Sequence, residues 1–107
     1  MDKKGRSIKV KFLEDLKNIL RDNKSHIESH FHVKNIGIFG SFARKEETDE
    51  SDVDLIVEFE KGYKDLFNYI DLKFYLEEIL NRRVDLVMKE AVRPRLRKKI
   101  FDEVQYV

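Results

Sequence analysis

Residues 37–57 constrain the fold of this chain more than any other stretch. They comprise an apolar segment that ends in Gly40-Ser41, a polar linker, and a second apolar segment that begins with Asp52-Val53-Asp54. Each apolar segment has the length and composition of a β-strand. Because side chains alternate between the two faces of a strand, Asp52 and Asp54 share one face, and Val53 begins the opposite, core-facing set.

The two carboxylates on one strand face repel each other, by roughly 4 kcal/mol at an effective dielectric constant of about 20. A purely structural strand gains nothing for that cost, whereas a hard divalent cation such as Mg²⁺ removes it. Gly40, at the turn after the first strand, lets backbone N–H groups approach a phosphate closely, and a following helix start favours negative charge. The pattern therefore predicts a site that binds a nucleotide together with a metal ion.

Composition limits the kind of protein that can carry such a site. The 107 residues fit one domain, which we expect to span 1–107, with an N-terminal packing helix at about 7–22 and a core at about 33–107. The net charge of +1 argues against direct nucleic-acid binding as the main task, and the absence of cysteine excludes thiolate metal sites. No segment has the length of a membrane span, so we expect a cytoplasmic protein without a membrane partner.

The hydrophobic pattern predicts alternating strands and helices. Strands are expected at 33–39, about 52–59, 83–88 and, as a short piece, in 104–107. Helices are expected at about 7–22, about 42–47, 65–81 and after Pro94. The helix at 65–81 is apolar on more than one stripe, so we expect it to be buried on a broad face. Its aromatic residues Phe67, Phe74 and Tyr75 are interpreted as core rather than as a base-stacking platform.

Two further groups of side chains have alternative interpretations. His26 and His30 have a spacing that a metal site can use, but no third ligand is near in sequence. We interpret them as solvated or edge-packing residues. The basic cluster Arg93, Arg95, Arg97, Lys98 and Lys99 is interpreted as a solvated helix face, with a phosphate or an acidic partner as the alternative ligand.

The ordered set of Gly40-Ser41, ten residues, Asp52-Val53-Asp54 and a later Asp85 resembles the motif of the DNA polymerase β superfamily of nucleotidyltransferases. It resembles in particular the small stand-alone minimal nucleotidyltransferase (MNT) proteins. The resemblance runs from about residue 36 to the C-terminus. It implies an α/β nucleotidyltransferase (DNA polymerase β-like) fold, with a small mixed sheet packed against helices, mainly on one side. One departure is Lys45, which stands where many relatives have glycine and could alter the turn.

The resemblance implies roles for the acidic residues. Asp52, Asp54 and Asp85 would be catalytic and would hold two Mg²⁺ ions, which stabilise both ends of an in-line displacement. Asp85 would lie nearer the acceptor and help to activate its hydroxyl group. Glu58, on the same strand face, is a rival third ligand, but it is roughly 13 Å along the strand from Asp54. We therefore prefer Asp85.

The resemblance also implies how the nucleotide is held. Gly40 and Ser41 would bind the β- and γ-phosphates of ATP, and Arg44 could reach the triphosphate. A surface ion pair between Arg44 and the acidic region 46–50 is the alternative. No P-loop, dinucleotide-binding fingerprint or protein-kinase motif is present in the sequence.

Stand-alone MNT proteins commonly accompany a HEPN-domain protein, and the resemblance implies an antitoxin that attaches AMP to a tyrosine of this toxin. We therefore expect a protein adenylyltransferase that depends on Mg²⁺ and ATP and acts on a protein hydroxyl. One alternative is nucleotidyl transfer to a small molecule or an RNA end, for which a homo-oligomer could build the substrate cleft. Another is a non-enzymatic module that binds the HEPN protein.

Overall fold

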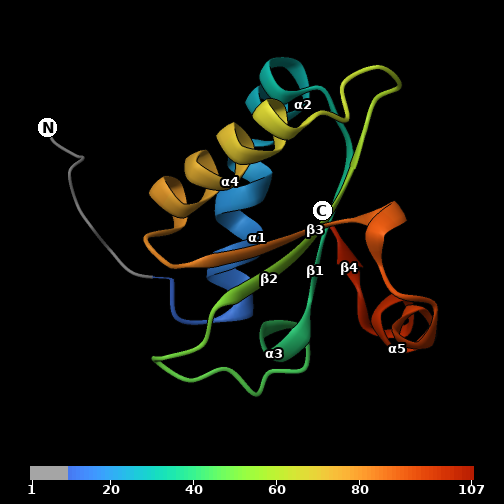
Figure 1. Ribbon diagram of the computed structural model, residues 1–107. Coiled ribbons are helices and arrows are strands. Elements are labelled where there is room, and N and C mark those ends of the chain that lie inside the picture. The colour runs from blue at the N-terminus through green and yellow to red at the C-terminus, as the bar shows by residue number, and fades with distance from the viewer. Residues whose placement is uncertain (1–9) are drawn as a thin grey trace, which may run out of the picture.

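Four strands form one mixed sheet in the order β3-β2-β1-β4 in the computed structural model, which describes residues 10–107 (Figure 1). The strands are β1 (Val33–Phe39), β2 (Val53–Phe59), β3 (Val84–Met88) and β4 (Gln105–Tyr106). β1 pairs antiparallel with β2 and β4, and β2 pairs parallel with β3. The expected mixed sheet is confirmed, and each strand lies within a residue or two of its predicted bounds.

The helices cover the two faces of the sheet unequally. They are α1 (Leu13–Asp22), α2 (Lys24–Phe31), α3 (Gly40–Ala43), α4 (Leu66–Leu80), the 3₁₀ helix η1 (Lys89–Ala91) and α5 (Pro94–Glu103). Figure 1 shows α1, α2 and α4 on one side of the sheet and α5 on the other. The helices therefore pack mainly on one side, as expected. Within residues 10–107, no helix combines the length and apolar character needed to cross a membrane.

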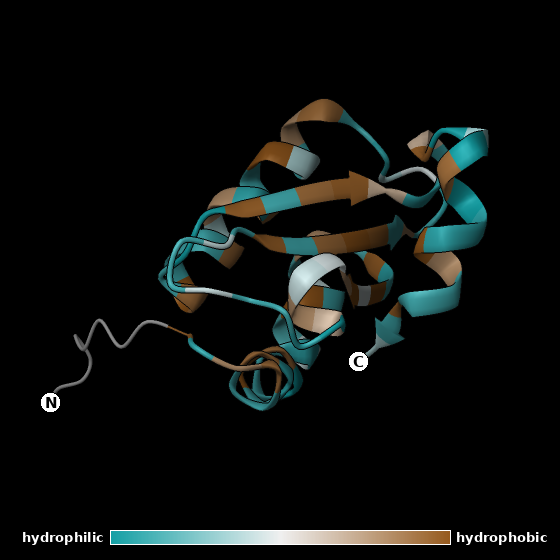
Figure 2. Ribbon diagram, turned by 90° about the horizontal axis from the view of Figure 1, so that it is seen from below, coloured by the Kyte–Doolittle hydropathy of each residue, from teal (hydrophilic) through white to brown (hydrophobic). Residues whose placement is uncertain are grey.

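The core lies between the sheet and the larger helical layer. Val53, Leu55 and Val57 of β2 are buried, as the alternation predicted. They belong to one hydrophobic cluster with Leu16 of α1 and Leu76 of α4. Figure 2 shows the brown, hydrophobic segments running along the strands and along the inner sides of these helices. This packing fixes the strand ends on which the acidic motif lies.

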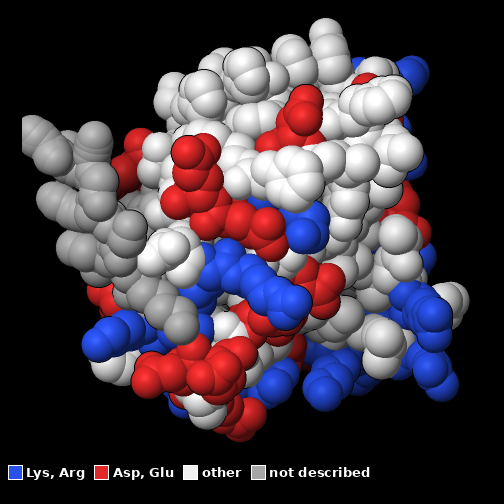
Figure 3. All heavy atoms as spheres, turned by 60° about the vertical axis from the view of Figure 1, so that its left-hand side comes forward, with Lys and Arg blue, Asp and Glu red and all other residues white. Residues whose placement is uncertain are grey.

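Helix α4 is less buried than the sequence indicates. Leu72 and Leu76 face the core, but Leu66, Phe67 and Phe74 are 64%, 78% and 62% exposed. The prediction of a broadly buried helix with Phe67 and Phe74 in the core is therefore wrong. The sheet is small and α4 shares this face with α1 and α2, so only one side of α4 reaches the core. Figure 3, which brings this side of the molecule forward, shows uncharged surface interrupted by acidic side chains.

Tyr75, in contrast, is half-buried against the core, and its hydroxyl donates a hydrogen bond of 3.0 Å to Asn23 Oδ1. Helix α2, which begins directly after Asn23, carries His26 and His30, whose rings stack with centroids 4.9 Å apart. The His26 ring also contacts Tyr75, with the centroids 5.1 Å apart. This geometry confirms the edge-packing interpretation of the two histidines.

Two predicted helix boundaries differ from the structure. The first helix begins at Leu13, and Val10 is buried although it precedes the helix. The part of the predicted helix before residue 10 lies outside the described residues. The helix predicted at 42–47 is instead the single turn α3, which starts at Gly40. It ends before Lys45, whose φ of 60° is left-handed, the backbone region that favours glycine. The turn therefore forms although lysine, rather than glycine, occupies this left-handed position.

Candidate functional site

The end of β1 lies beside the start of β2, and Gly40 lets the chain after β1 approach the Asp54 side chain closely. Phe39 pairs with Asp54 across the two strands, and Gly40 has a φ of +73°. A Cβ atom built on Gly40 would lie 2.1 Å from Asp54 Oδ2. Both the backbone conformation and the lack of space therefore require glycine here, and the Gly40 backbone is held against the Asp54 carboxylate.

Asp54 and Asp85 occupy matching positions on neighbouring strands, because β2 and β3 pair in parallel with Asp54 opposite Asp85. Asp52 lies just before β2. The pKa of the half-buried Asp54 is raised from 3.8 to about 6, first by burial and then by the negative charges of Asp85 and Asp52. The structure thus brings Asp52 and Asp85 within electrostatic range of Asp54. The charge that they concentrate around Asp54 is what a cation would relieve.

The acidic residues fit Mg²⁺ in their chemistry and charge. In the described part of the chain, no three His, Asp or Glu side chains are gathered closely enough to hold a metal by themselves. Mg²⁺ does not need such a cage, because it keeps several waters and is usually bound by one or two carboxylates plus substrate phosphates. Asp52, Asp54 and Asp85 are the residues that would supply these carboxylates.

Glu58, the rival ligand, has other partners. It pairs with Asn35 across the strands, and its carboxylate accepts a hydrogen bond of 3.0 Å from the Asn35 amide. Its oxygens are also 4.0 Å from Lys34 Nζ and 3.5 Å from Lys89 Nζ. Glu58 is therefore paired with cations at the opposite end of β2 from Asp54.

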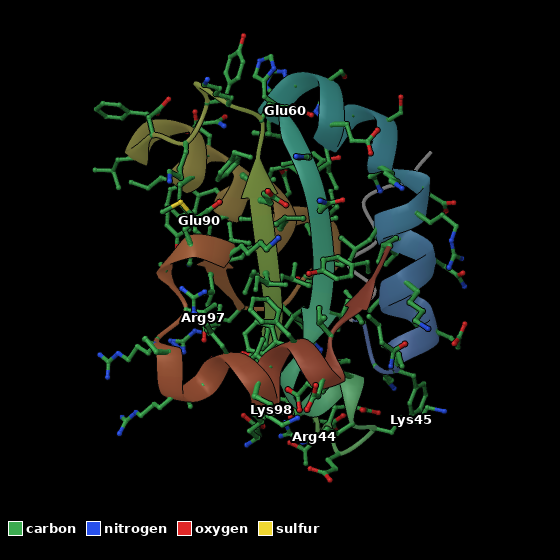
Figure 4. The ribbon with its side chains drawn as sticks, turned by 90° about the vertical axis from the view of Figure 1, so that its right-hand side faces the viewer. Arg44, Lys45, Glu60, Glu90, Arg97 and Lys98 are labelled. Carbon is green, nitrogen blue, oxygen red and sulfur yellow. The ribbon has the colours of Figure 1, made fainter. Side chains whose placement is uncertain are left out.

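The donors next to Asp54 are already engaged by Glu103, the last residue of α5. The Gly40 N–H donates to Glu103 Oε2 over 2.7 Å, and Arg44 Nη1 is 3.1 and 3.3 Å from the two Glu103 oxygens. Arg44 Nε also donates to Glu46 Oε1 over 3.0 Å, so part of the predicted surface ion pair is present. These contacts, with Glu46 first, raise the pKa of Arg44 above its usual range. Figure 4 shows Arg44 below the C-terminal part of α5.

Sequence analysis did not identify Glu103. It lies far from the motif in the sequence, among the basic residues of the last helix, and no local pattern distinguishes it from Asp102. The basic cluster itself is exposed along α5, and Lys98 pairs with Asp102 over 2.8 Å. The solvated-face interpretation of that cluster is confirmed. Ser41 follows Gly40 in α3, and its carbonyl accepts from the Glu46 N–H over 2.9 Å.

Arg82 is a second residue that sequence analysis missed, and it supports the loop before Asp52. It is only 7% exposed, and its Nη1 donates to the carbonyls of Thr48, Asp49 and Ser51 over 3.3, 3.3 and 2.7 Å. Its Nε donates to the Val10 carbonyl. A buried arginine that satisfies several backbone acceptors fixes the loop that leads into β2. The pair Arg82-Arg83 gives no signal in the sequence that one of them is buried.

Comparison with known proteins connects this geometry to a family. The nucleotidyltransferase domain family matches residues 13–107. Protein adenylyltransferase MntA of Thermococcus cleftensis is 42% identical over 95 residues, covering 89% of this chain and 95% of that protein. A Methanocaldococcus jannaschii protein assigned as a protein adenylyltransferase is 42% identical over 100 residues, covering 92% of this chain and 100% of its own.

Solved structures confirm the expected fold. A structure assigned as a minimal nucleotidyltransferase has a TM-score of 0.76 and 35% identity, covering 89% of this chain and 95% of its own. A toxin–antitoxin structure with AMP-PNP has a TM-score of 0.62 at 22% identity, covering 88% and 70%. A complex of a tri-AMPylated Shewanella oneidensis HEPN toxin with an MNT antitoxin has a TM-score of 0.54 at 21% identity, covering 88% and 66%. At the identities of the last two, the likeness shows the fold alone.

Proposed function

Because this chain belongs to the nucleotidyltransferase domain family, we propose that it transfers AMP from ATP to a hydroxyl group of a partner protein. The observation that carries the proposal is the convergence of the Gly40 backbone, Asp54 and Asp85 at one end of the sheet. A relative that is 42% identical over most of both chains is named a protein adenylyltransferase, which supports a protein as the acceptor.

The reaction assigns a distinct task to each side of the site. The acceptor oxygen forms a bond to the α-phosphorus of ATP, the bond from that phosphorus to the bridging oxygen breaks, and pyrophosphate leaves. Asp54 and Asp52 would bind Mg²⁺, whose positive charge would stabilise the attacking and leaving oxygens. Asp85 is exposed, so it can complete the metal site and receive the proton of the acceptor hydroxyl.

The phosphates would bind on the β1 side of these carboxylates. The Gly40 N–H and the Arg44 guanidinium already point at one anionic group, the Glu103 carboxylate. Backbone N–H groups and arginine are the usual donors to phosphate oxygens. Since α3 has only four residues, these specific donors rather than a helix dipole would hold the β- and γ-phosphates, together with Ser41.

The partner we propose is a HEPN-domain toxin, modified on a tyrosine, with this chain as the antitoxin. The support is the shared fold with the MNT antitoxin of a complex that contains a tri-AMPylated HEPN toxin. The exposed apolar side chains on α4 also suit a protein partner, since large exposed apolar patches often mark interaction surfaces.

The test uses ATP labelled at the α- or the γ-phosphate, Mg²⁺ and the purified chain with a HEPN protein from the same cell. We expect label from the α-position only, on the protein and at a tyrosine. Asp54→Asn should lower the rate by at least about 100-fold because it removes a metal-binding charge. Glu58→Gln is the matched control and should stay within about twofold, since its carboxylate faces Lys34 and Lys89.

The other outcomes identify different reactions. Label from the α-position on RNA or on a small molecule would contradict a protein acceptor and leave nucleotidyl transfer intact. Label from the γ-position alone would contradict nucleotidyl transfer. Binding of the HEPN protein without any labelled product would support a non-enzymatic binding module.

A further inference from the structure

We propose that Glu103 is an additional residue of the nucleotide site, where its carboxylate holds the place of a phosphate group until the nucleotide displaces it. This inference rests on the proposed function, because it takes Gly40 and Arg44 as phosphate-binding groups. It adds to the motif a residue from α5 that opposes nucleotide binding rather than favouring it.

The contacts of Glu103 are those that a bound phosphate would make. One oxygen accepts from the Gly40 N–H over 2.7 Å, and both oxygens lie within 3.3 Å of Arg44 Nη1. The 2.7 Å bond is at the short end for N–H···O and is typical of a charge-assisted hydrogen bond. Carboxylates and phosphates present the same kind of paired anionic oxygens to such donors. The two therefore compete for one set of partners.

The surrounding charge makes simultaneous binding unfavourable. The Glu103 side chain is only 15% exposed, and its charge contributes to the negative field at Asp54. A triphosphate placed on Gly40 and Arg44 would add several negative charges next to this carboxylate. Dissolved salt screens such partly buried charges much less than it screens fully exposed ones. We infer that Glu103 must leave its donors when the triphosphate binds.

The exchange requires little movement of the backbone. Glu103 is the last residue of α5, and Val104 already has extended backbone angles after it. Rotation of the glutamate side chain toward solvent would free both donors while α5 and β4 stay in place. Arg44 would keep its second contact with Glu46, 3.0 Å from Nε, and so remain near the site.

The neighbouring residue Asp102 provides a matched control. It has the same charge and lies on the same helix, but its side chain is 65% exposed and pairs with Lys98 over 2.8 Å. The decisive comparison is between Glu103→Gln and Asp102→Asn in the full chain. Each variant removes one negative charge without changing side-chain size, so a general effect of net charge would appear in both.

Affinity for ATP and for inorganic pyrophosphate is measured by calorimetry for the wild-type protein and both variants. We expect Glu103→Gln to bind both ligands about 3- to 10-fold more tightly because the charged competitor is gone. Thermal stability without ligand should fall in the same variant, since the ion pair with Arg44 is lost. Asp102→Asn should leave the affinity within about twofold.

Opposite changes in affinity and stability separate a competitor from a merely structural residue, whose loss would lower both. Unchanged or weaker ligand binding by Glu103→Gln would overturn the inference. The amide proton resonance of Gly40 gives an independent readout: it should move upfield in Glu103→Gln and return downfield when pyrophosphate is added. If neither the wild type nor Glu103→Gln binds ATP, the proposed function fails at its first step and the inference fails with it. Binding by the wild type without a gain in the variant counts against the inference alone.

Discussion

Asp54 shows at the scale of one residue how the site works against the stability of the fold. Burial and the charges of Asp85 and Asp52 raise its pKa to about 6, so its charged form costs more free energy in the folded protein than in the unfolded chain, although it still predominates at neutral pH. A residue kept under such a penalty fits a functional role better than a structural one. The same carboxylate that would bind the metal therefore destabilises the protein in the absence of a cation.

This penalty predicts that Asp54→Asn is more stable than the wild type at pH 7 without divalent cations. We expect a gain of about 1 kcal/mol in the free energy of unfolding, reduced from the full effect because the side chain is only half-buried. The pH dependence is opposite to that of most carboxylates, whose charged form stabilises the folded state. Between pH 3.8 and about 6, the folded protein keeps a proton on Asp54 that the unfolded chain has released. Wild-type stability should thus decrease relative to the variant as pH rises through this range.

Urea unfolding of both proteins at pH 3.5, 5 and 7 measures the effect. The difference between them should be smallest at the lowest pH, where Asp54 is mostly protonated in both states, and largest at pH 7. A constant difference across the three values would show that the Asp54 charge is not its cause. Added Mg²⁺ should reduce the difference at pH 7 if the ion binds the wild-type carboxylates.

A second prediction for a single residue concerns Arg82, which donates hydrogen bonds to backbone carbonyls of the loop before Asp52. Lysine cannot reproduce its planar set of donors, so Arg82→Lys should leave carbonyls of the loop before Asp52 unsatisfied. We expect a loss of about 2 kcal/mol in the free energy of unfolding, measured by chemical denaturation. The adjacent Arg83 is exposed, and Arg83→Lys should change stability by less than about 0.5 kcal/mol. Equal effects of the two substitutions would contradict the anchoring role.

At the scale of elements, α4 has two apolar sides, of which one is buried against the sheet and the other is exposed. Leu76 is fully buried, whereas Phe67 is 78% exposed. Leu76→Ala should cost about 3 kcal/mol of stability because it leaves a cavity between α4 and the sheet. Phe67→Ala should change stability by less than about 0.5 kcal/mol despite removing a larger side chain. Thermal unfolding of the two variants distinguishes this arrangement from a helix buried on both sides.

The contrast between strands and α4 explains what could be predicted from the sequence. The twofold alternation in β2 identifies the face that packs on the helical layer, because a strand has only two faces, although Ile56 on the opposite face is buried as well. The helix offers apolar residues around more of its circumference, and nothing local tells which of them the rest of the chain will cover. The position of Phe67 depends on how α1 and α2 share the sheet with α4. That arrangement is a property of the tertiary structure.

The same limit applies to the candidate site. Gly40, Asp52 and Asp54 could be chosen from a short stretch with a clear chemical reason, and Asp85 from a carboxylate inside an apolar strand. Glu103 could not, because it becomes significant only when α5 is folded back against the end of β1. Arg82 is indistinguishable from Arg83 until the loop carbonyls surround it. Residues whose role arises from long-range contacts leave no periodic signal.

At the scale of the whole molecule, the site draws on elements from widely separated parts of the chain. In the proposed site, α3 and the residue after it would supply the phosphate donors, the starts of β2 and β3 would supply the carboxylates, and α5 would supply Glu103. None of these elements contains a complete site. The sheet brings them to one end because β2 lies between β1 and β3.

The parallel pairing of β2 with β3 has a consequence for the order of events during folding. β1 and β2 can pair as soon as both are available, but β3 must cross over through α4 before Asp85 stands beside Asp54. Such long-range closures are entropically costly and tend to form late. Asp85 therefore joins Asp52 and Asp54 only after β3 has paired with β2. Reactivity would thus be acquired only after β3 has joined the sheet, and chains in which β3 is not yet paired would be inactive.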